Sequence, residues 1–450
     1  MENITLLDYV LLPFYIMVIY FIAIFIRNKY YTHKHPWRKY FLTGLTVKII
    51  GAVINGMLHH YYYGGGDTFN FFYHSRIINT AMDESLVKWV NLILHLPDYY
   101  DIDYYKYTSQ LPWYTDESSY TVGAAGAFFG LFTFNTYLPT AVIFAFVSYS
   151  GVWAMFRTFA KMYPHLTKQI AIAILFIPTM VLWGSAIYKD TICIFGLGWL
   201  TYVTFRFMIQ RDFSVQNIFL AVFSFILIAK IKIYILIAFL PALGMWILLT
   251  YTEKMSNTSL RRAVKLGTIF FIMAISVFLM SVYSEQLGAY SLEKLADKAE
   301  ETRQWISYAS ELTDGSTYSL GDIDPNDPTS MLLKFPQAVN VTLFRPYVWE
   351  TKKLIMAFSA LEAMLFLAIT LRVLISVGLK RTWKAINLDA TTQFCLIFAI
   401  IFAFAVGVTT YNFGSLSRYK IPCLPFYIMA LILIFYRYNP PQKKILPPLF

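Results

Sequence analysis

Long apolar runs recur along this sequence, and they constrain its fold more than any other feature. An α-helix rises 1.5 Å per residue, so about 20 apolar residues are enough to cross roughly 30 Å of hydrocarbon. Several runs reach that length, which predicts an all-α fold, a polytopic transmembrane helical bundle of about 11 spans in a single integral-membrane domain over 1–450. The predicted spans lie near 8–26, 40–60, 136–158, 168–183, 191–209, 215–229, 233–250, 264–283, 353–377, 391–410 and 421–437.

The composition agrees with a membrane protein. Hydrophobic residues make up 58% of the chain and charged residues 14%, whereas soluble domains carry about 25% charged residues. The first apolar run follows acidic rather than basic residues and precedes no small-residue cleavage site, so it is predicted to be a span and not a signal peptide. The three cysteines lie within or beside apolar runs without the spacing of metal ligands, which indicates small buried side chains.

Basic residues gather in alternate short connections and predict the orientation of the chain. Loops that carry more Lys and Arg face the cytoplasm. With eleven spans the basic connections share one side, which places the N-terminus outside and the C-terminus in the cytoplasm. The net charge of +11 is then a topology signal, and it does not indicate a nucleic-acid partner. The basic connections are 27–39, 157–168, 206–211, 254–265, 380–384 and 437–444.

The two longest segments on the opposite side, 61–119 and 284–352, are acidic. In the second, the apolar spacing of 291–312 predicts a helix, and a turn-rich stretch follows it. We also expect residues 120–135 to form a partial or re-entrant helix. With no sequence repeat and no soluble domain apparent, function is expected among the spans and these two extracytoplasmic loops.

Ionisable residues on this outer side lie at the ends of several predicted spans, where their side chains can converge. Charged groups at membrane depth are costly and therefore usually face a cavity and carry function. A carboxylate beside several cations suits an acid–base step next to an anionic leaving group. Candidate acids are Asp67 and Asp190, a glycine hinge precedes the first, and candidate cations follow in later segments: Gly64, Gly65, Gly66, Lys189, Lys230, Lys232, Arg345, Arg418 and Lys420.

Each candidate also has a structural interpretation. Asp67 is suited to cap the helix that "DTFNFF" begins, and Lys189 and Asp190 could form an ion pair within a short turn. Lys230 and Lys232 could reach lipid headgroups, and Arg345 could pair with an acid of its own segment. A metal set of His59, His60 and His74 requires that the fold bring them together, so a divalent metal cofactor stays open.

Three short segments carry a resemblance to a known superfamily. "GGGDTFNFF" (64–72) resembles the first-loop aspartate region of the GT-C integral-membrane glycosyltransferases. "PTMVLWGSAIYKD" (178–190) and "NFGSLSRYKIPCLPFYIMAL" (412–431) look like segments of bacterial membrane proteins of that superfamily. These proteins include polysaccharide polymerases of the O-antigen type. The resemblance covers these segments and the layout of the spans.

The resemblance implies a sugar donor carried on polyprenyl phosphate and transferred to a glycan acceptor outside a bacterial inner membrane. It implies that Asp67 is the general base, with Asp190 the nearest match to a second acidic position. The departing phosphate would be held by Arg418, together with Arg345, Lys189 and the neighbouring Lys420. The glycines would let the loop approach the sugar, and Tyr61–Tyr63 and Trp183 would stack on sugar rings or fix the span ends.

Two other function classes compete with the transferase. A transporter or flippase for a charged or lipid-linked solute would place ionisable residues near the bilayer midplane within broken helices. Most candidates here lie at span ends, and Lys48 is the main ionisable residue deep in a predicted span. A non-catalytic membrane scaffold, the third possibility, would tolerate Asp67→Asn.

Overall fold

The computed structural model describes residues 3–32, 35–252, 259–260, 263–264, 267, 317–321, 328–351 and 353–440. Most of these residues are helical, and the β-type pairing among them is an isolated antiparallel bridge between Thr317 and Asn412. The predicted all-α class is therefore confirmed for the described chain. The predicted span at 264–283 and the predicted helix at 291–312 lie outside the described residues.

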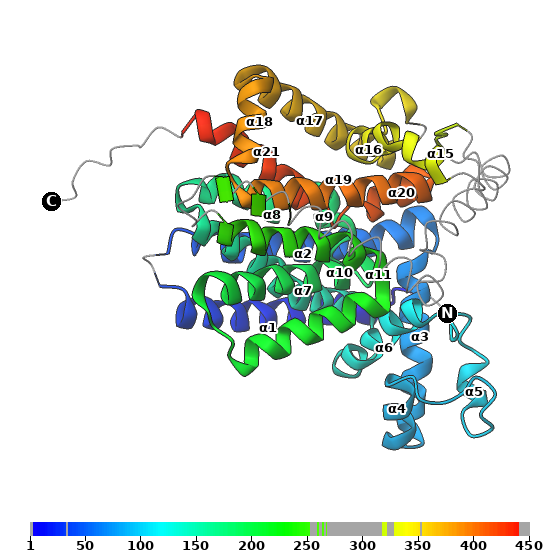
Figure 1. Cartoon of the computed structure of the whole chain (residues 1–450). Coiled ribbons are helices and arrows are strands. Elements are labelled where there is room, and N and C mark those ends of the chain that lie inside the picture. The colour runs from blue at the N-terminus through cyan, green and yellow to red at the C-terminus, as the bar shows by residue number, and fades with distance from the viewer. Residues whose placement is uncertain are drawn as a thin grey trace. The chain divides into compact units, whose positions relative to one another are not determined.

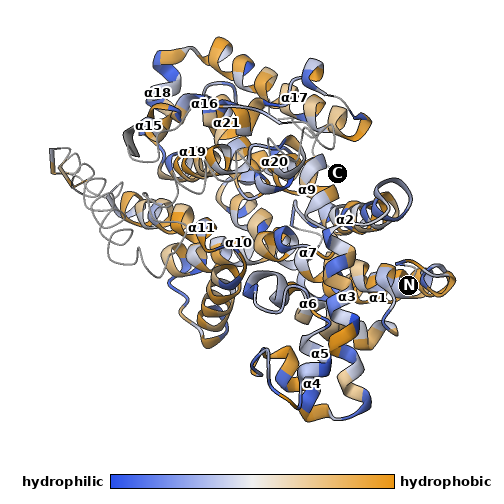
Figure 2. Ribbon diagram, turned by 90° about the vertical axis from the view of Figure 1, so that its right-hand side faces the viewer, coloured by the Kyte–Doolittle hydropathy of each residue, from blue (hydrophilic) through white to orange (hydrophobic). Residues whose placement is uncertain are grey.

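Within the described ranges, seven helices are long and apolar enough to cross a membrane, or eight if one bent pair forms a single span. Figure 2 shows hydrophobic residues in orange along most of these helices. The chain is an integral membrane protein. The seven helices are α1 (Leu6–Tyr30), α2 (Lys39–Met57, extended by a π-helical turn, Leu58–Tyr63), α7 (Tyr137–Met162), α10 (Lys189–Phe205), α11 (Val215–Thr252), α17 (Leu354–Val377) and α19 (Ala390–Thr410).

Four predicted spans differ from the helices observed. The span predicted at 168–183 is wrong as a continuous helix, because the chain forms α8 (Thr167–Leu175) and α9 (Pro178–Trp183); Pro178 lacks the amide hydrogen that a continuing helix would need. The spans predicted at 215–229 and 233–250 meet in α11, which leaves the helical conformation at Lys232 (φ −149°, ψ 76°). The last span is bent by 66° between α20 (Phe413–Tyr419) and α21 (Leu424–Tyr438).

The chain forms two compact units, and a single domain over 1–450 stays a prediction. Unit 1 comprises Met1–Met162 and Ile174–Leu236. Its helices α1, α2, α7 and α10 run side by side, with α7 packed against the other three (Figure 1). The helices α7 and α10 cross closely at two glycines, Gly151 and Gly198. The approach is so close that a Cβ on Gly198 would overlap the carbonyl of Gly151.

The outer segment predicted at 61–119 is a helical lobe of unit 1. The helix α3 (Asp67–Thr80) runs across the direction of α1, α2 and α7, and α4 (Leu86–Ile93) and α5 (Tyr105–Thr108) project beyond it (Figure 1). The helix α6 (Glu117–Gly130) packs along α3 and overlaps the partial helix predicted at 120–135. The lobe has an apolar core of its own, which includes Ile78, Trp89, Leu92, Tyr107, Leu111 and Tyr120.

Unit 2 comprises Tyr163–Ala173 and Ile237–Phe450. In its described part, α19 packs against α21 and against α16 (Phe335–Phe344), which follows α15 (Pro328–Leu333). The helix α18 (Leu379–Asn387) connects α17 to α19. Aromatic rings fill the core: Phe398 meets Phe239 and Phe426 edge to face, with ring centroids 5.1 and 4.9 Å apart.

Candidate functional site

Three helices of unit 1 begin with acidic residues, and these are the elements that position the candidate site. The helix α3 starts at Asp67, α6 is capped by Asp116, and α10 carries Asp190 in its first turn. The Asp116 carboxylate accepts a hydrogen bond from the Ser118 amide at 3.1 Å. Helix N-termini carry a partial positive charge, which favours carboxylates at these positions.

The predicted glycine hinge has a conformational basis at two of its three positions. The π-helical turn that extends α2 ends at Gly64 (φ 69°), and Gly66 has φ 128°. Side-chain-bearing residues rarely adopt these angles. A Cβ on Gly66 would also lie 2.7 Å from Cδ2 of His59, whereas one on Gly65 would meet nothing within 4 Å. Because Gly66 occupies the N-cap position, Asp67 is the first helical residue and not the cap.

Lysines from two later segments form ion pairs with acids on other helices. Nζ of Lys189 lies 3.3 Å from Oδ2 of Asp116 and donates to Oγ of Ser118 at 2.6 Å. Nζ of Lys230 lies 3.0 Å from Oε1 of Glu117. The starts of α6 and α10 and the break in α11 are thereby brought together at one place in unit 1.

A third ion pair joins α10 to the break in α11, where Nζ of Lys232 lies 2.5 Å from Oδ1 of Asp190. Asp67 lies near enough to Lys189 for their charges to interact. We call this group the acid–lysine cluster; it consists of Asp67, Asp116, Glu117, Lys189, Asp190, Lys230 and Lys232. The sequence led us to expect that eight ionisable residues could converge, and the structure brings five of them into this cluster: Asp67, Lys189, Asp190, Lys230 and Lys232. The other three, Arg345, Arg418 and Lys420, belong to unit 2.

Burial divides the cluster into a closed part and an open part. The side chains of Asp190 and Lys232 are 0% and 7% exposed, so this pair is shielded from water. Lys189 is 22% exposed and Asp116 48%, and Asp67 is half-buried. Asp67 is therefore the accessible carboxylate of the two predicted catalytic acids, while Asp190 holds Lys232 at the helix break. A catalytic role for Asp190 stays a prediction.

Asp116 supplies a permanent negative charge at the open part. Burial alone would raise the pKa of its carboxyl group, but hydrogen bonds from Ser119 and Ser118 and the charge of Lys189 outweigh burial and lower the pKa to about 2. The carboxylate therefore stays ionised near neutral pH. It holds the Lys189 ammonium in place beside Asp67.

Aromatic residues surround the hinge, some exposed and some packed. Tyr61, Tyr62 and Tyr63 are 71%, 53% and 45% exposed. Trp183, which the sequence placed with them as a stacking residue, is instead buried, with its ring 5.8 Å from that of His59. The tyrosines therefore offer ring surface to a ligand, whereas Trp183 supports His59.

The three histidines considered as metal ligands do not form a metal site. In the described part of the chain no three His, Cys, Asp or Glu side chains come together as metal ligands. Nδ1 of His59 lies 2.9 Å from the Asn55 carbonyl oxygen, and its Nε2 lies 3.0 Å from the Tyr188 hydroxyl. His74 is buried in α3, and burial lowers its pKa to about 4, so its imidazole is neutral near pH 7.

Unit 2 contains the other three predicted phosphate ligands. Arg345 binds Glu350 in a forked geometry, with Nε 3.0 Å from each carboxylate oxygen. This is the pairing with an acid of its own segment that the sequence left open. Its guanidinium also lies over the ring of Phe413, 5.3 Å from the centroid. Phosphate binding by Arg345 stays a prediction.

The remaining two cations lie at the bend of the last span. Arg418 belongs to α20 and is half-buried, whereas Lys420 is 0% exposed and its Nζ has no hydrogen-bond partner among the described residues. A buried acid of α17, Glu362, lies near enough for its charge to interact with that of Lys420. The predicted phosphate contacts of Arg418 and Lys420 stay predictions.

Sequence reasoning did not select several residues that the structure places at these sites. Asp116 and Glu117 counted only as part of an acidic loop, although an aspartate before Ser118 and a run of small residues is a signal for a helix start. Glu362 is a single acid within a long apolar run, and no pattern in the sequence indicated that it lies near Lys420.

Comparisons of the chain with models of protein families, with curated proteins and with solved structures give no match.

Proposed function

We propose that this chain is a GT-C-like membrane glycosyltransferase or polysaccharide polymerase. It would transfer sugar from a polyprenyl-phosphate-linked donor to a glycan acceptor on the extracytoplasmic side, in the assembly of cell-surface polysaccharide. The observation that supports this proposal is the open part of the acid–lysine cluster, where the accessible Asp67, shortly after one candidate span, lies near Lys189 at the start of another. A lipid-linked donor carries its phosphate at headgroup level, which is where the proposal places this cluster.

The chemistry needs one base and at least one cation. The Asp67 carboxylate would accept the proton of an acceptor hydroxyl as that oxygen attacks the anomeric carbon of the donor sugar. The bond from that carbon to the phosphate oxygen breaks, and the phosphate leaves with both electrons of the bond. Lys189 and Lys230 would stabilise the negative charge that develops on the leaving phosphate. Transfer in this form needs none of Arg345, Arg418 and Lys420.

Other features of unit 1 suit the donor and acceptor. The exposed rings of Tyr61, Tyr62 and Tyr63 provide flat surfaces against which the apolar faces of sugars can pack. The buried pair of Asp190 and Lys232 fixes the start of α10 and thereby positions Lys189. In this mechanism Asp190 is a positioning residue and Asp67 the catalytic one.

The experiment is complementation of a deletion in the source organism at matched protein levels, with surface polysaccharide as the readout. We expect wild type to restore full-length glycan, and Asp67→Asn and Lys189→Met to fail. Asp103→Asn is the matched control, because Asp103 is an exposed acid of the same lobe whose carboxylate makes no ion pair with any described residue. Full restoration by Asp67→Asn would refute the assignment of the base, and unchanged glycan in the deletion strain would refute the transferase.

A transporter or flippase for a charged or lipid-linked solute is the second candidate, and the break in α11 favours it. Broken helices with ionisable residues at the break are a feature of secondary transporters, and Lys232 lies at such a break with Asp190 as its buried partner. Loss of a transferase would leave the lipid-linked donor on the outer leaflet. Loss of a flippase would leave it on the inner leaflet, so the side on which the donor accumulates separates the two.

A further inference from the structure

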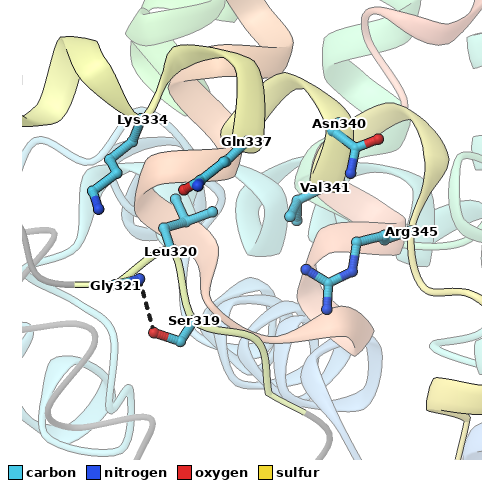
Figure 3. Close-up of a pocket in the computed structure, with 8 residues that line it drawn as sticks. All are labelled: Ser319, Leu320, Gly321, Lys334, Gln337, Asn340, Val341 and Arg345. Atoms are coloured by element: carbon cyan, nitrogen blue, oxygen red, sulfur yellow. Dashed lines mark hydrogen bonds between the residues drawn. The ribbon is translucent and has the colours of Figure 1, made fainter.

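A pocket of about 520 Å³ opens in unit 2 between α16 and the segment 319–321 (Figure 3). Sites for small molecules have volumes of about 300–1,000 Å³. The floor contains two buried apolar side chains, Leu320 and Val341. Apart from Gly321, the remaining described lining residues are polar or cationic, whereas ligand pockets are lined mostly by apolar side chains. This lining points to a hydrophilic ligand.

One wall of the pocket follows α16 and the residues at its two ends. Lys334 precedes the helix, Gln337 and Asn340 project from one face of it, and Arg345 ends it (Figure 3). Positions three residues apart share a face of a helix. Two carboxamides are therefore aligned between two cations along one side of the cavity.

The opposite wall is an extended segment held firmly to α19. The amide of Tyr318 donates to the Tyr411 carbonyl at 3.1 Å, and its hydroxyl donates to the Gly407 carbonyl at 2.9 Å. The segment turns at Gly321 (φ 78°), whose amide donates to Oγ of Ser319 at 3.0 Å (Figure 3). A hydroxyl and a fixed backbone thus face the carboxamides of α16.

The described lining of the pocket carries positive charge. Among the described residues that line it, two are cationic and none is acidic. Glu350 bonds to Arg345 through Nε and Nη2, and a guanidinium has five N–H donors, so donors of Arg345 remain available. Nζ of Lys334 makes no hydrogen bond or ion pair with any described residue. An anionic group in the cavity would therefore meet two cations.

From this lining we propose that the pocket binds a saccharide that carries a carboxylate or a phosphate group. Carboxamides and hydroxyls form hydrogen bonds with sugar hydroxyls as donors and as acceptors, and the guanidinium of Arg345 and the ammonium of Lys334 bind the anionic group. The site lies wholly in unit 2 and does not depend on the transfer reaction proposed for unit 1.

The experiment measures binding to the full-length chain, purified in detergent, by isothermal titration calorimetry. The probes are glucuronate, glucose 1-phosphate, glucose, inorganic phosphate and a short-chain prenyl phosphate. We expect glucuronate and glucose 1-phosphate to bind at least tenfold more tightly than glucose or inorganic phosphate. Lys334→Ala should weaken the binding of both anionic sugars at least tenfold, and Gln337→Leu should weaken it several-fold. Lys380→Ala should leave binding unchanged, because Lys380 is an exposed lysine of α18 outside the pocket.

Lys334→Ala and Gln337→Leu leave the pair of Arg345 and Glu350 in place, and unchanged thermal unfolding of these variants will show that they fold. Absence of binding by both anionic sugars would overturn the proposal, as would binding that neither variant changes. If inorganic phosphate and glucose 1-phosphate bound equally well, the pocket would not recognise the sugar, and the proposal of a saccharide ligand would be refuted. Binding of prenyl phosphate alone would identify a lipid-phosphate site instead.

Discussion

The lysines of the acid–lysine cluster pair with acids on distant segments of unit 1, whereas the arginine of the unit 2 pocket pairs with a near neighbour. Lys189 and Asp116 are 73 residues apart in sequence, and Lys232 and Asp190 are 42 apart. Arg345 and Glu350 are five apart. Distant pairs fix the ends of separate helices relative to one another, while a near pair shapes only its own turn.

This difference separates charges that hold the fold from charges available to a ligand. In the acid–lysine cluster each lysine has an acid on another helix, so removal of either partner leaves a charge without its counterion. In the pocket Lys334 has no ion pair with any described residue, and Glu350 offsets only part of the positive charge. The first arrangement is sensitive to mutation, and the second is suited to bind anions.

The strongest test of this comparison uses two lysines of one segment. Lys232→Ala leaves Asp190 as a buried charge without its ammonium partner, which costs about 3–5 kcal/mol. Lys230→Ala removes an exposed pair, in which Lys230 and Glu117 are 47% and 58% exposed, and costs about 1 kcal/mol or less. Thermal unfolding in detergent measures both variants. Equal losses would contradict the division into closed and open parts, and the double variant D190L/K232M should recover much of the stability.

The two regions should also respond differently to acid. His74 has a pKa lowered from 6.5 to about 4 by burial, so below pH 6.5 the unfolded chain binds a proton that the folded lobe does not. Stability of the lobe therefore falls as pH falls from 6.5 to 4, by up to about 3 kcal/mol. Hydrogen exchange of α3 and α6 at pH 7 and pH 5 measures this change, and His74→Leu should remove most of it.

Unit 2 provides the internal control for that measurement. Burial alone would raise the pKa of Glu350, but hydrogen bonds from Arg345 and the Tyr347 amide outweigh it and lower the pKa. Stability from this pair is present above the usual value of 4.5 and is lost only at lower pH. The free energy of opening of α16, obtained from exchange rates corrected for the intrinsic effect of pH, should therefore stay unchanged at pH 5. Equal acceleration in α6 and α16 would argue against His74 as the cause.

The sequence was sufficient to predict the features that depend on local pattern. Apolar length identified the long helices. The argument that helix ends on one side of a membrane share a plane led us to expect convergence of the outer ionisable residues, and within unit 1 the structure brings Asp67, Lys189, Asp190, Lys230 and Lys232 together. The glycines before Asp67 predicted a flexible hinge; Gly64 and Gly66 have positive φ angles, and the flexibility of the hinge stays a prediction.

Features that depend on tertiary partners could not be predicted in this way. The break at Lys232 lies between two apolar runs, and only the contact with Asp190 distinguishes it from an ordinary interfacial lysine. The acidic segment 61–119 did not predict the apolar core of the lobe that it forms. The buried residues of that core are spread over several short helices and their connections, so no single helix contains more than a few of them. Arg345 had several acids within reach in sequence, and only the fold selects Glu350.

The glycine hinge gives a smaller effect that separates two of its three positions. Gly66→Ala places a Cβ at φ 128° and 2.7 Å from Cδ2 of His59, which we expect to cost about 1–3 kcal/mol. Gly65→Ala is the matched control, because its Cβ would meet nothing within 4 Å, and we expect a change within about 0.5 kcal/mol. Thermal unfolding of the two variants measures the difference. Equal destabilisation by both would show that flexibility, and not the conformation of Gly66, is what the loop needs.

The smallest effect concerns the local pair of unit 2. Glu350→Gln removes the carboxylate beside Arg345 and leaves an amide of similar shape, so the pocket gains a net positive charge. At an exposed fraction of 20% for Glu350, solvent screens the change, and we expect a gain of about 0.5–1 kcal/mol in glucuronate binding at low salt. Calorimetry at low and high ionic strength measures it, and the gain should shrink as salt rises. Weaker binding by Glu350→Gln would mean that Glu350 orients Arg345 for the ligand, and the local pair would then be part of the binding site rather than a competitor for it.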